Sequence, residues 1–182
     1  MCGILNTFKG VITMSFKEIN VNDINENFIK NIGDEWMLIT AGDSEKYNMM
    51  TASWGFAGVM WGFPMAIAAV RPQRYTIEFL KSKDYFTLSF YGDDKTMHAV
   101  CGKESGREVN KTEKTGLTPL FDPTTNAPYF DEARLVLICK KVYTQDLDSS
   151  AFLEEDIKAK WYPNSDYHTM FYGKIDKALV RV

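Results

Sequence analysis

The chain has 182 residues, which is the length of one domain, or of one domain with small additions. Its net charge is only −3, and this argues against nucleic acid as a partner, because nucleic-acid-binding domains present a basic face. Aromatic residues make up 14% of the chain, a share that suits a packed β-rich core or a ligand with a flat ring.

The cysteines and histidines of the chain are few and scattered. Cys2, Cys101 and Cys139 have no regular spacing, so they predict neither a disulfide framework nor a zinc motif, and only His98 and His168 could add imidazole ligands. We therefore expect no metal site, buried thiols at the two later cysteines, and a reducing, cytoplasmic location. No apolar run reaches the ~20 residues that a membrane helix needs, so we expect no membrane association.

The predicted domain begins a short way into the chain. Residues 1–13 have an interrupted apolar stretch that does not fit a signal peptide, and we interpret them as an N-terminal extension. Residues 14–182 contain no repeat and no linker, and they predict a single domain.

Short helices and strands follow one another through the first half of that domain. The predicted elements are a helix over 23–32, strands over 36–41 and 48–54 that form a hairpin, a loop over 55–64, a strand over 65–70, a helix over 72–83 and a strand over 85–91. Phe86, Leu88 and Phe90 alternate with polar residues in the last of these, which is the pattern of a half-buried strand. The loop contains three aromatic residues and could cap a flat ligand, cover the core as a lid, or form a dimer contact.

The second half predicts longer strands. Its elements are a short helix that begins at Asp93 or Asp94, a polar loop over 102–116, an irregular segment over 117–130, a long strand within 134–147, a helix over 151–160 and, over 166–182, either a strand pair or one bent strand. About six or seven strands, most of them adjacent in sequence, predict a mostly antiparallel β-barrel with short helical insertions rather than a doubly wound parallel sheet.

One stretch could bind a phosphate. Thr51 and Ser53 end a predicted strand, and Arg71, Arg74 and Thr76 surround the start of a predicted helix. Backbone N–H groups at a helix start lack partners, and hydroxyl and guanidinium groups nearby would add donors. Spacing alone favours the alternative, in which these residues form an ordinary edge of a β core.

Four motifs then raise a family resemblance. They are Asn48-Met-Met-Thr-Ala-Ser-Trp54, Arg71-Pro-Gln-Arg-Tyr-Thr76, Ser105-Gly-Arg107 with Lys111, and Tyr167-His-Thr-Met-Phe-Tyr-Gly173. In this order and at these intervals the chain resembles the flavin reductase-like family, and its flavoredoxin-type branch in particular, over residues 14–182. The resemblance implies a Greek-key-like, FMN-binding split β-barrel that forms a homodimer with the flavin near the subunit interface.

The resemblance also implies an activity. Family members bind FMN, commonly take hydride from NADH or NADPH, and pass electrons to free flavin, iron or a partner protein. We therefore expect an NAD(P)H-dependent, FMN-binding oxidoreductase. The first alternative is a non-enzymatic electron carrier that a redox partner protein reduces. The others are a structural or ligand-binding split barrel that has lost flavin and, less favoured because histidines are few, a related barrel that binds another flat ring such as haem.

Site residues carry over from the family by position. The cofactor-binding set is Asn48, Thr51, Ala52, Ser53, Trp54, Arg71, Arg74, Tyr75, Thr76, Ser89 and Lys111. Within it the resemblance implies the phosphate end for Arg71, Arg74, Tyr75, Thr76 and Lys111, and the ribityl chain for Ser89. His168 matches a histidine near the ring edge, and a change of its charge near pH 7 would stabilise a reduced, anionic flavin. Many relatives have aspartate where this chain has Asn110. Without that carboxylate we expect either a looser loop or a different partner for Lys111.

Overall fold

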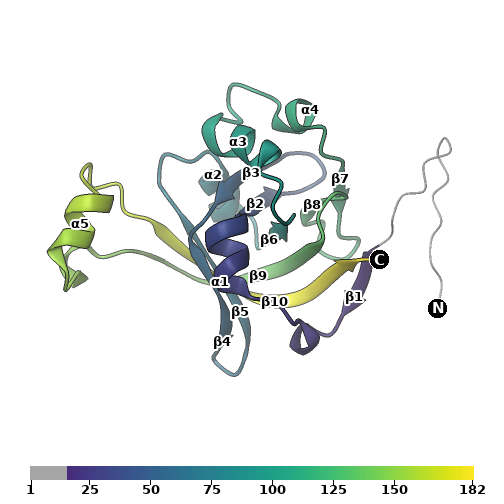
Figure 1. Cartoon of the computed structure of the whole chain (residues 1–182), viewed down its shortest axis with the longest axis horizontal. Coiled ribbons are helices and arrows are strands. Elements are labelled where there is room, and N and C mark those ends of the chain that lie inside the picture. The colour runs from purple at the N-terminus through teal and green to yellow at the C-terminus, as the bar shows by residue number, and fades with distance from the viewer. Residues whose placement is uncertain (1–15) are drawn as a thin grey trace.

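The computed structural model describes residues 16–182 (Figure 1). The predicted extension, residues 1–13, lies outside the described residues. The described part is dominated by antiparallel strands with a few short helices around them, which confirms the predicted fold class.

One large sheet carries the fold, and every pairing in it is antiparallel. Its strands run in the order β3-β2-β6-β9-β10-β5-β4, and β1 lies beside β10. The bounds are β1 Phe16–Ile19, β2 Met37–Gly42, β3 Tyr47–Ala52, β4 Gly55–Met60, β5 Phe63–Val70, β6 Tyr85–Phe90, β9 Leu135–Asp146 and β10 Thr169–Arg181; β7 Pro119–Phe121 and β8 Pro128–Phe130 form a separate pair. Because β3 and β4 do not pair with each other, the curved sheet stays open between them, as a split barrel does.

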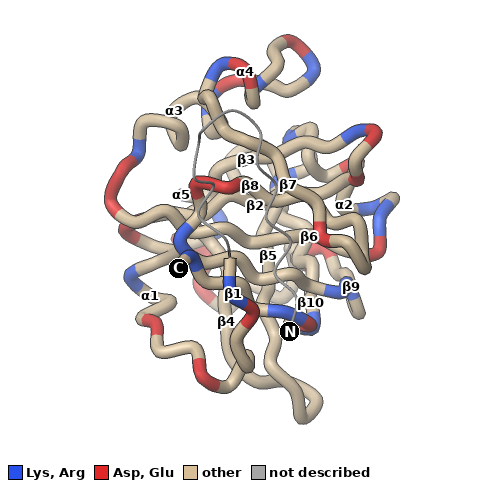
Figure 2. The backbone as a smooth tube through the Cα atoms, turned by 90° about the vertical axis from the view of Figure 1, so that its right-hand side faces the viewer, with Lys and Arg blue, Asp and Glu red and all other residues tan. Residues whose placement is uncertain are grey.

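The helices are short. They are α1 Phe28–Lys30, which continues into a π-helical turn over Asn31–Glu35, α2 Thr76–Ser82, α3 Thr96–Lys103, α4 Lys111–Thr115 and α5 Glu155–Trp161; 3-10 turns cover Val21–Asp23 and Ser149–Ala151. Among these helices, α2 packs Ile77, Phe79 and Leu80 into the main core. No helix in residues 16–182 has the length and apolar character to span a bilayer. Figure 2 shows acidic and basic residues interspersed along the chain, as the small net charge leads one to expect.

Apolar clusters on both faces of the sheet hold these elements together. The alternating residues Phe86, Leu88 and Phe90 of β6 point into the barrel, where they are almost fully buried in the main core. The opposite face of β2 and β3 contributes Leu38 and Met49 to a second cluster, which is completed from outside by α3 and β8. The second cluster fixes α3 against β3, and this contact positions the site described below.

An arm extends from the barrel. β9 and β10 continue beyond the other strands and carry α5 at their far end, on the left of Figure 1. α5 has no buried residue, and Leu153 just before it is almost fully exposed. Residues 169–181 form one continuous strand, β10, rather than a strand pair. Its pairing with β9 shifts register between Tyr172 and Gly173 and between Ile175 and Lys177. Of the two predicted alternatives, one bent strand is therefore the correct one.

Three predicted segments are wrong in detail. The predicted loop over 55–64 is the β4–β5 hairpin, whose two turn residues, Trp61 and Gly62, both have positive φ, as a tight hairpin turn requires. The predicted loop over 102–116 contains α4, which begins at an Asn110 cap and ends before the left-handed Gly116. The segment predicted to be irregular, 117–130, contains the β7–β8 pair.

The predicted helix over 23–32 is also shorter and later than expected. Asn27 caps α1 by accepting a hydrogen bond from the backbone of Lys30, and the following π-helical turn extends the segment to Glu35. The strand β1 was not among the predicted elements.

Candidate functional site

A polar cavity of about 330 Å³ lies at the open edge of the barrel. It is bounded by the end of β3, the end of β5 with the turn that follows it, and the arm. Its lining residues are Met50, Thr51, Ala52, Ser53, Trp54, Ala69, Arg71, Arg74, Trp161 and His168. The structure thus brings together, from three separate sequence motifs, most of the residues that the sequence assigned to a flavin site.

The edge of β3 presents backbone groups toward this side of the molecule. In an antiparallel pair, alternate residues direct their N–H and C=O groups to the neighbouring strand, and the others direct theirs away from it. The carbonyl of Met49 accepts a hydrogen bond from Lys111 Nζ at 2.9 Å, so Met49 faces away from β2. Thr51 lies two residues further along and shares this orientation, which leaves its backbone available at the cavity.

The side chain of Thr51 is directed toward α3. Its hydroxyl donates to the carbonyl of His98 at 2.9 Å and lies 3.1 Å from Nδ1 of the same histidine. These contacts hold the end of β3 against α3, so the contribution of Thr51 to the cavity is chiefly its backbone.

Arg74 supplies a cation at the wall of the cavity. Its guanidinium donates to the carbonyls of Gly102 at 2.7 Å and Cys101 at 3.2 Å, at the C-terminus of α3, where helix carbonyls lack partners and positive charge is favourable. Burial lowers the pKa of Arg74, and it makes no ion pair with any carboxylate in residues 16–182. Its charge is therefore available to an anionic ligand.

Lys111 lies behind Arg74 rather than in the cavity. Its Nζ donates to the carbonyls of Met49 and Cys101, and only 4% of the residue is exposed. Burial lowers the pKa of Lys111 to about 8, and the nearby charge of Arg74 acts in the same direction. Burial likewise raises the pKa of the Cys101 thiol to about 11, so the thiol is neutral beside the two cations.

Arg71 has a different environment from Arg74. It forms an ion pair with the carboxylate of Asp166 and donates to the carbonyl of Trp161 at 2.8 Å, and its guanidinium lies 5.1 Å from the centre of the Tyr162 ring. All three partners belong to the arm. Arg71 therefore fastens the arm to the barrel at the rim of the cavity.

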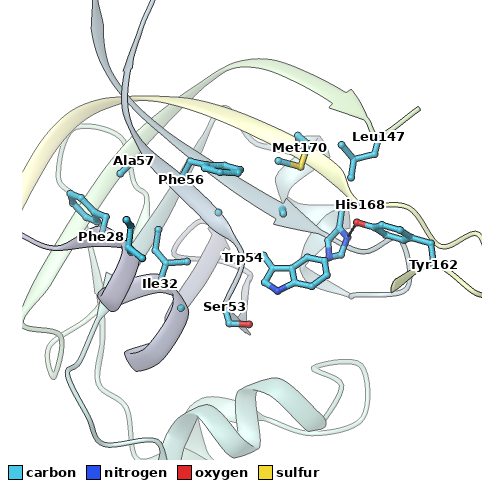
Figure 3. A pocket seen from close by; sticks show the side chains of 14 residues that line it. Phe28, Ile32, Ser53, Trp54, Phe56, Ala57, Leu147, Tyr162, His168 and Met170 are labelled. Atoms are coloured by element: carbon cyan, nitrogen blue, oxygen red, sulfur yellow. Dashed lines mark hydrogen bonds between the residues drawn. The ribbon is translucent and has the colours of Figure 1, made fainter. Parts of the chain in front are cut away.

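His168 is buried between aromatic side chains. Its Nδ1 lies 2.8 Å from the hydroxyl of Tyr162, and its ring centre lies 4.9 Å from that of Trp54 (Figure 3). Burial, aided by the charge of Arg71, lowers its pKa to about 4. The expected change of charge near pH 7 is thus not a property of this imidazole, which is neutral there.

Besides Lys111, four more predicted residues lie away from the cavity. Asn48 and Thr76 are buried and bonded to each other, Nδ2 to Oγ1 at 2.8 Å. Tyr75 packs edge-on against Phe79 of α2. Ser89 is buried in the layer between the sheet and the β7–β8 pair, and its hydroxyl has no hydrogen-bond partner in the described residues.

The start of α2 differs from the predicted anion site. The backbone N–H groups of Ile77 and Glu78 already donate to the carbonyls of Arg74 and Tyr75, at 3.0 and 3.1 Å. They are satisfied within the turn, so the helix start offers less to a phosphate than the sequence suggested. The nearby Gly106 of the Ser105-Gly-Arg107 motif is explained by packing, because a Cβ there would overlap the side-chain amide of Asn48.

Sequence reasoning missed a second, larger pocket. This apolar pocket has a volume of about 590 Å³ and lies between the π-helical turn, β4 and the base of the arm (Figure 3). It shares four lining residues with the polar cavity: Ser53, Trp54, Ala69 and His168. The only sequence signal was the aromatic segment over 55–64, which was interpreted as a loop. In residues 16–182 no cluster of three or more His, Cys, Asp or Glu is placed to hold a metal ion.

The fold and the cavity define a split-barrel domain with a cavity at its open edge. The family model described as "Flavin reductase like domain" matches residues 30–181, and the chain belongs to that family. The resemblance based on the four motifs is therefore confirmed.

Solved structures agree on the fold. A flavoredoxin from Methanosarcina acetivorans is 23% identical with a TM-score of 0.60, covering 79% of this chain and 67% of that chain. A flavoredoxin of Desulfovibrio vulgaris is 18% identical with a TM-score of 0.62, covering 97% and 76%. A Streptomyces globisporus NADH:FAD oxidoreductase, in complex with NAD and FAD fragments, is 17% identical with a TM-score of 0.60, covering 81% and 74%. Comparison with curated proteins gives no significant match.

Proposed function

We propose that the protein is an FMN-binding oxidoreductase of the flavin reductase type, which takes electrons from NADH or NADPH and passes them to an acceptor. The observation that carries the proposal is the polar cavity at the open edge of the barrel. It combines a free strand edge, the indole of Trp54 and an unpaired guanidinium, Arg74, in a member of the flavin reductase-like family. The strand edge would supply hydrogen-bond donors to the edge of the flavin ring, Trp54 would supply a flat surface for the ring, and Arg74 would supply a cation for the phosphate.

Each group would then have a defined task. The backbone of Thr51 and the hydroxyl of Ser53 would orient the ring, and Trp54 with His168 would cover one side of it and exclude water. Arg74 would attract the phosphate through a charge-assisted hydrogen bond. Bound FMN supplies the electron-accepting ring, so the protein needs no nucleophile of its own.

The first test is the visible spectrum of the purified protein under anaerobic conditions. Flavin bands that bleach with NADH or NADPH support the proposed reductase and identify the donor. Bands that stay oxidised with both donors contradict it and favour the electron carrier that a partner protein reduces. A colourless protein that takes up no added FMN refutes both.

The second test uses Arg74 and the phosphate of the flavin. We expect Arg74→Gln to weaken FMN binding at least tenfold, since a hydrogen bond to a charged group contributes about 1.5–3 kcal/mol. Riboflavin has no phosphate, so its affinity should change less than threefold. Arg107→Gln is the matched control, because Arg107 is exposed, is paired with Glu78 and does not line the polar cavity.

The outcome distinguishes two roles for Arg74. Equal losses for FMN and riboflavin would mean that Arg74 only holds α3 in place. Arg74→Lys keeps the charge, and we expect it to recover part of the FMN affinity.

We further propose a cytoplasmic homodimer. Phe56, Val59, Met60 and Trp61 leave large apolar side chains of the β4–β5 hairpin exposed, and apolar patches of this kind commonly mark protein contacts. Sedimentation at micromolar concentration should give twice the subunit mass. A single subunit mass would exclude the dimer, and with it the expectation that the flavin lies near a subunit interface.

A further inference from the structure

The apolar pocket differs from the polar cavity in the chemistry of its lining. None of its lining residues carries a charged side chain, and most are aliphatic or aromatic. Its polar groups gather at one end, where Trp54, His168 and Tyr162 lie in a row (Figure 3). Burying an ionised group costs several kcal/mol or more unless a partner compensates it, so this pocket selects against charged occupants.

The size of the pocket suits a small molecule. Its volume of about 590 Å³ lies within the roughly 300–1,000 Å³ that is typical of small-molecule sites. Phe28 and Phe56 border it at one end and Trp54 at the other, so a flat molecule would meet aromatic surfaces at both ends (Figure 3). A nicotinamide dinucleotide would bring two phosphates to a site that has no cation.

The position of the pocket links it to the proposed flavin site. Ser53, Trp54, Ala69 and His168 line both spaces, so an occupant of one lies a side chain away from an occupant of the other. The hydrogen bond between His168 and Tyr162, at 2.8 Å, fixes the shared wall. This proximity is what a site for the molecule that exchanges electrons with a bound ring requires.

We propose that the apolar pocket is a binding site for an uncharged, flat molecule of one or two rings. Its relevance to electron transfer rests on the proposed function, but the binding itself does not require the flavin. The pocket is therefore distinct in specificity from the polar cavity, which favours an anionic ligand.

Naphthalene-2-carboxamide and naphthalene-2-carboxylate test the proposal directly, because they share one shape and differ by one charge. In titration calorimetry with the wild-type protein, with and without FMN, we expect the amide to bind at least tenfold more tightly than the carboxylate. Failure of the amide to bind, or equal affinity for the two compounds, would overturn the proposal.

A pair of variants locates the binding. Ala57 is half-buried in the pocket lining on β4, whereas Val59, on the same face of that strand, is 78% exposed and lies outside the lining. Ala57→Asp should weaken amide binding at least tenfold, and Val59→Asp should leave it within twofold. Equal effects of the two substitutions would overturn the assignment to this pocket.

FMN content and sedimentation are measured on the same samples. A protein that holds FMN but never binds the amide refutes this inference and leaves the proposed function intact. Failure of the wild-type protein to take up added FMN refutes the proposed function alone, because amide binding is tested without flavin as well. A third result would also refute the inference. If the wild type does not bind the amide and Ala57→Asp no longer forms a dimer, a second copy of the chain covers the pocket.

Discussion

Replacing Lys111 with methionine tests whether the buried ammonium group destabilises the flavin-free protein near neutral pH. The side chain is almost fully enclosed, and its Nζ donates to two backbone carbonyls. Burial lowers its pKa from the ordinary 10.5 to about 8. Between these two values the unfolded chain keeps the proton that the folded chain has lost.

The sign and size of the effect follow from proton linkage. Stability rises with pH wherever the unfolded state binds more protons, so Lys111 by itself contributes a stability that increases from about pH 7 toward pH 10. With pKa values of about 8 and 10.5 for Lys111, the gain from pH 7 to pH 9 is about 1 kcal/mol. Methionine cannot titrate, so Lys111→Met should lack this gain. At pH 7 the stability of Lys111→Met balances relief of the buried charge against the Met49 carbonyl, which loses its partner, and the Cys101 carbonyl, which keeps only Arg74.

The assay is urea unfolding of flavin-free protein at pH 7, 8 and 9. The quantity compared is the difference in unfolding free energy between wild type and Lys111→Met, which removes titrations that both share. Lys114→Met is the control, because Lys114 lies on the same helix but is exposed and paired with Glu104. A difference between wild type and Lys111→Met that stays constant over this pH range would refute the reasoning.

Repeating the unfolding measurements with bound FMN tests whether the flavin phosphate lies near Lys111. A phosphate beside Arg74 and Lys111 would favour the charged amine and raise its pKa. Adding FMN should therefore flatten the pH dependence, and riboflavin should not. An unchanged pH dependence with saturating FMN would place the phosphate away from Lys111.

Two further predictions concern stability. Gly173→Ala should lower the unfolding free energy by about 1–3 kcal/mol, because a Cβ there would lie 2.6 Å from Phe86 Cζ and 2.7 Å from Cys139 Cβ. Urea unfolding measures this loss. An unchanged urea midpoint would mean that β10 shifts freely at its bulge and avoids the overlap. Burial lowers the pKa of both His98 and His168 to about 4, so each should contribute stability above pH 6.5 that is lost as the pH falls toward 4, about 2 kcal/mol by pH 5. His168→Gln should lose less stability than the wild type between pH 7.5 and 5, and parallel curves would contradict the assigned pKa.

The sequence predicted those parts of the fold that local patterns encode. Alternation in β6 identified the face that enters the main core, but not the burial of the opposite face, where Thr87 and Ser89 are fully buried as well. The missed β4–β5 hairpin had a signal in its turn, where Gly62 follows Trp61. Long-range partners carry no such signal. The carboxylate of Asp166 lies 95 residues from Arg71, and nothing in either local sequence says which charges the arm will bring together.

The same limit explains why two arginines of one motif have different roles. Arg71 and Arg74 are three residues apart, and spacing treats them alike. In the fold, Arg71 is neutralised by Asp166 on the arm, whereas Arg74 meets only the carbonyls at the end of α3. Carbonyl dipoles satisfy the donors of a guanidinium but do not cancel its full charge. Of the two, it is therefore Arg74 that has no carboxylate partner in residues 16–182, as the proposed phosphate contact requires, whereas Arg71 fastens the arm to the barrel.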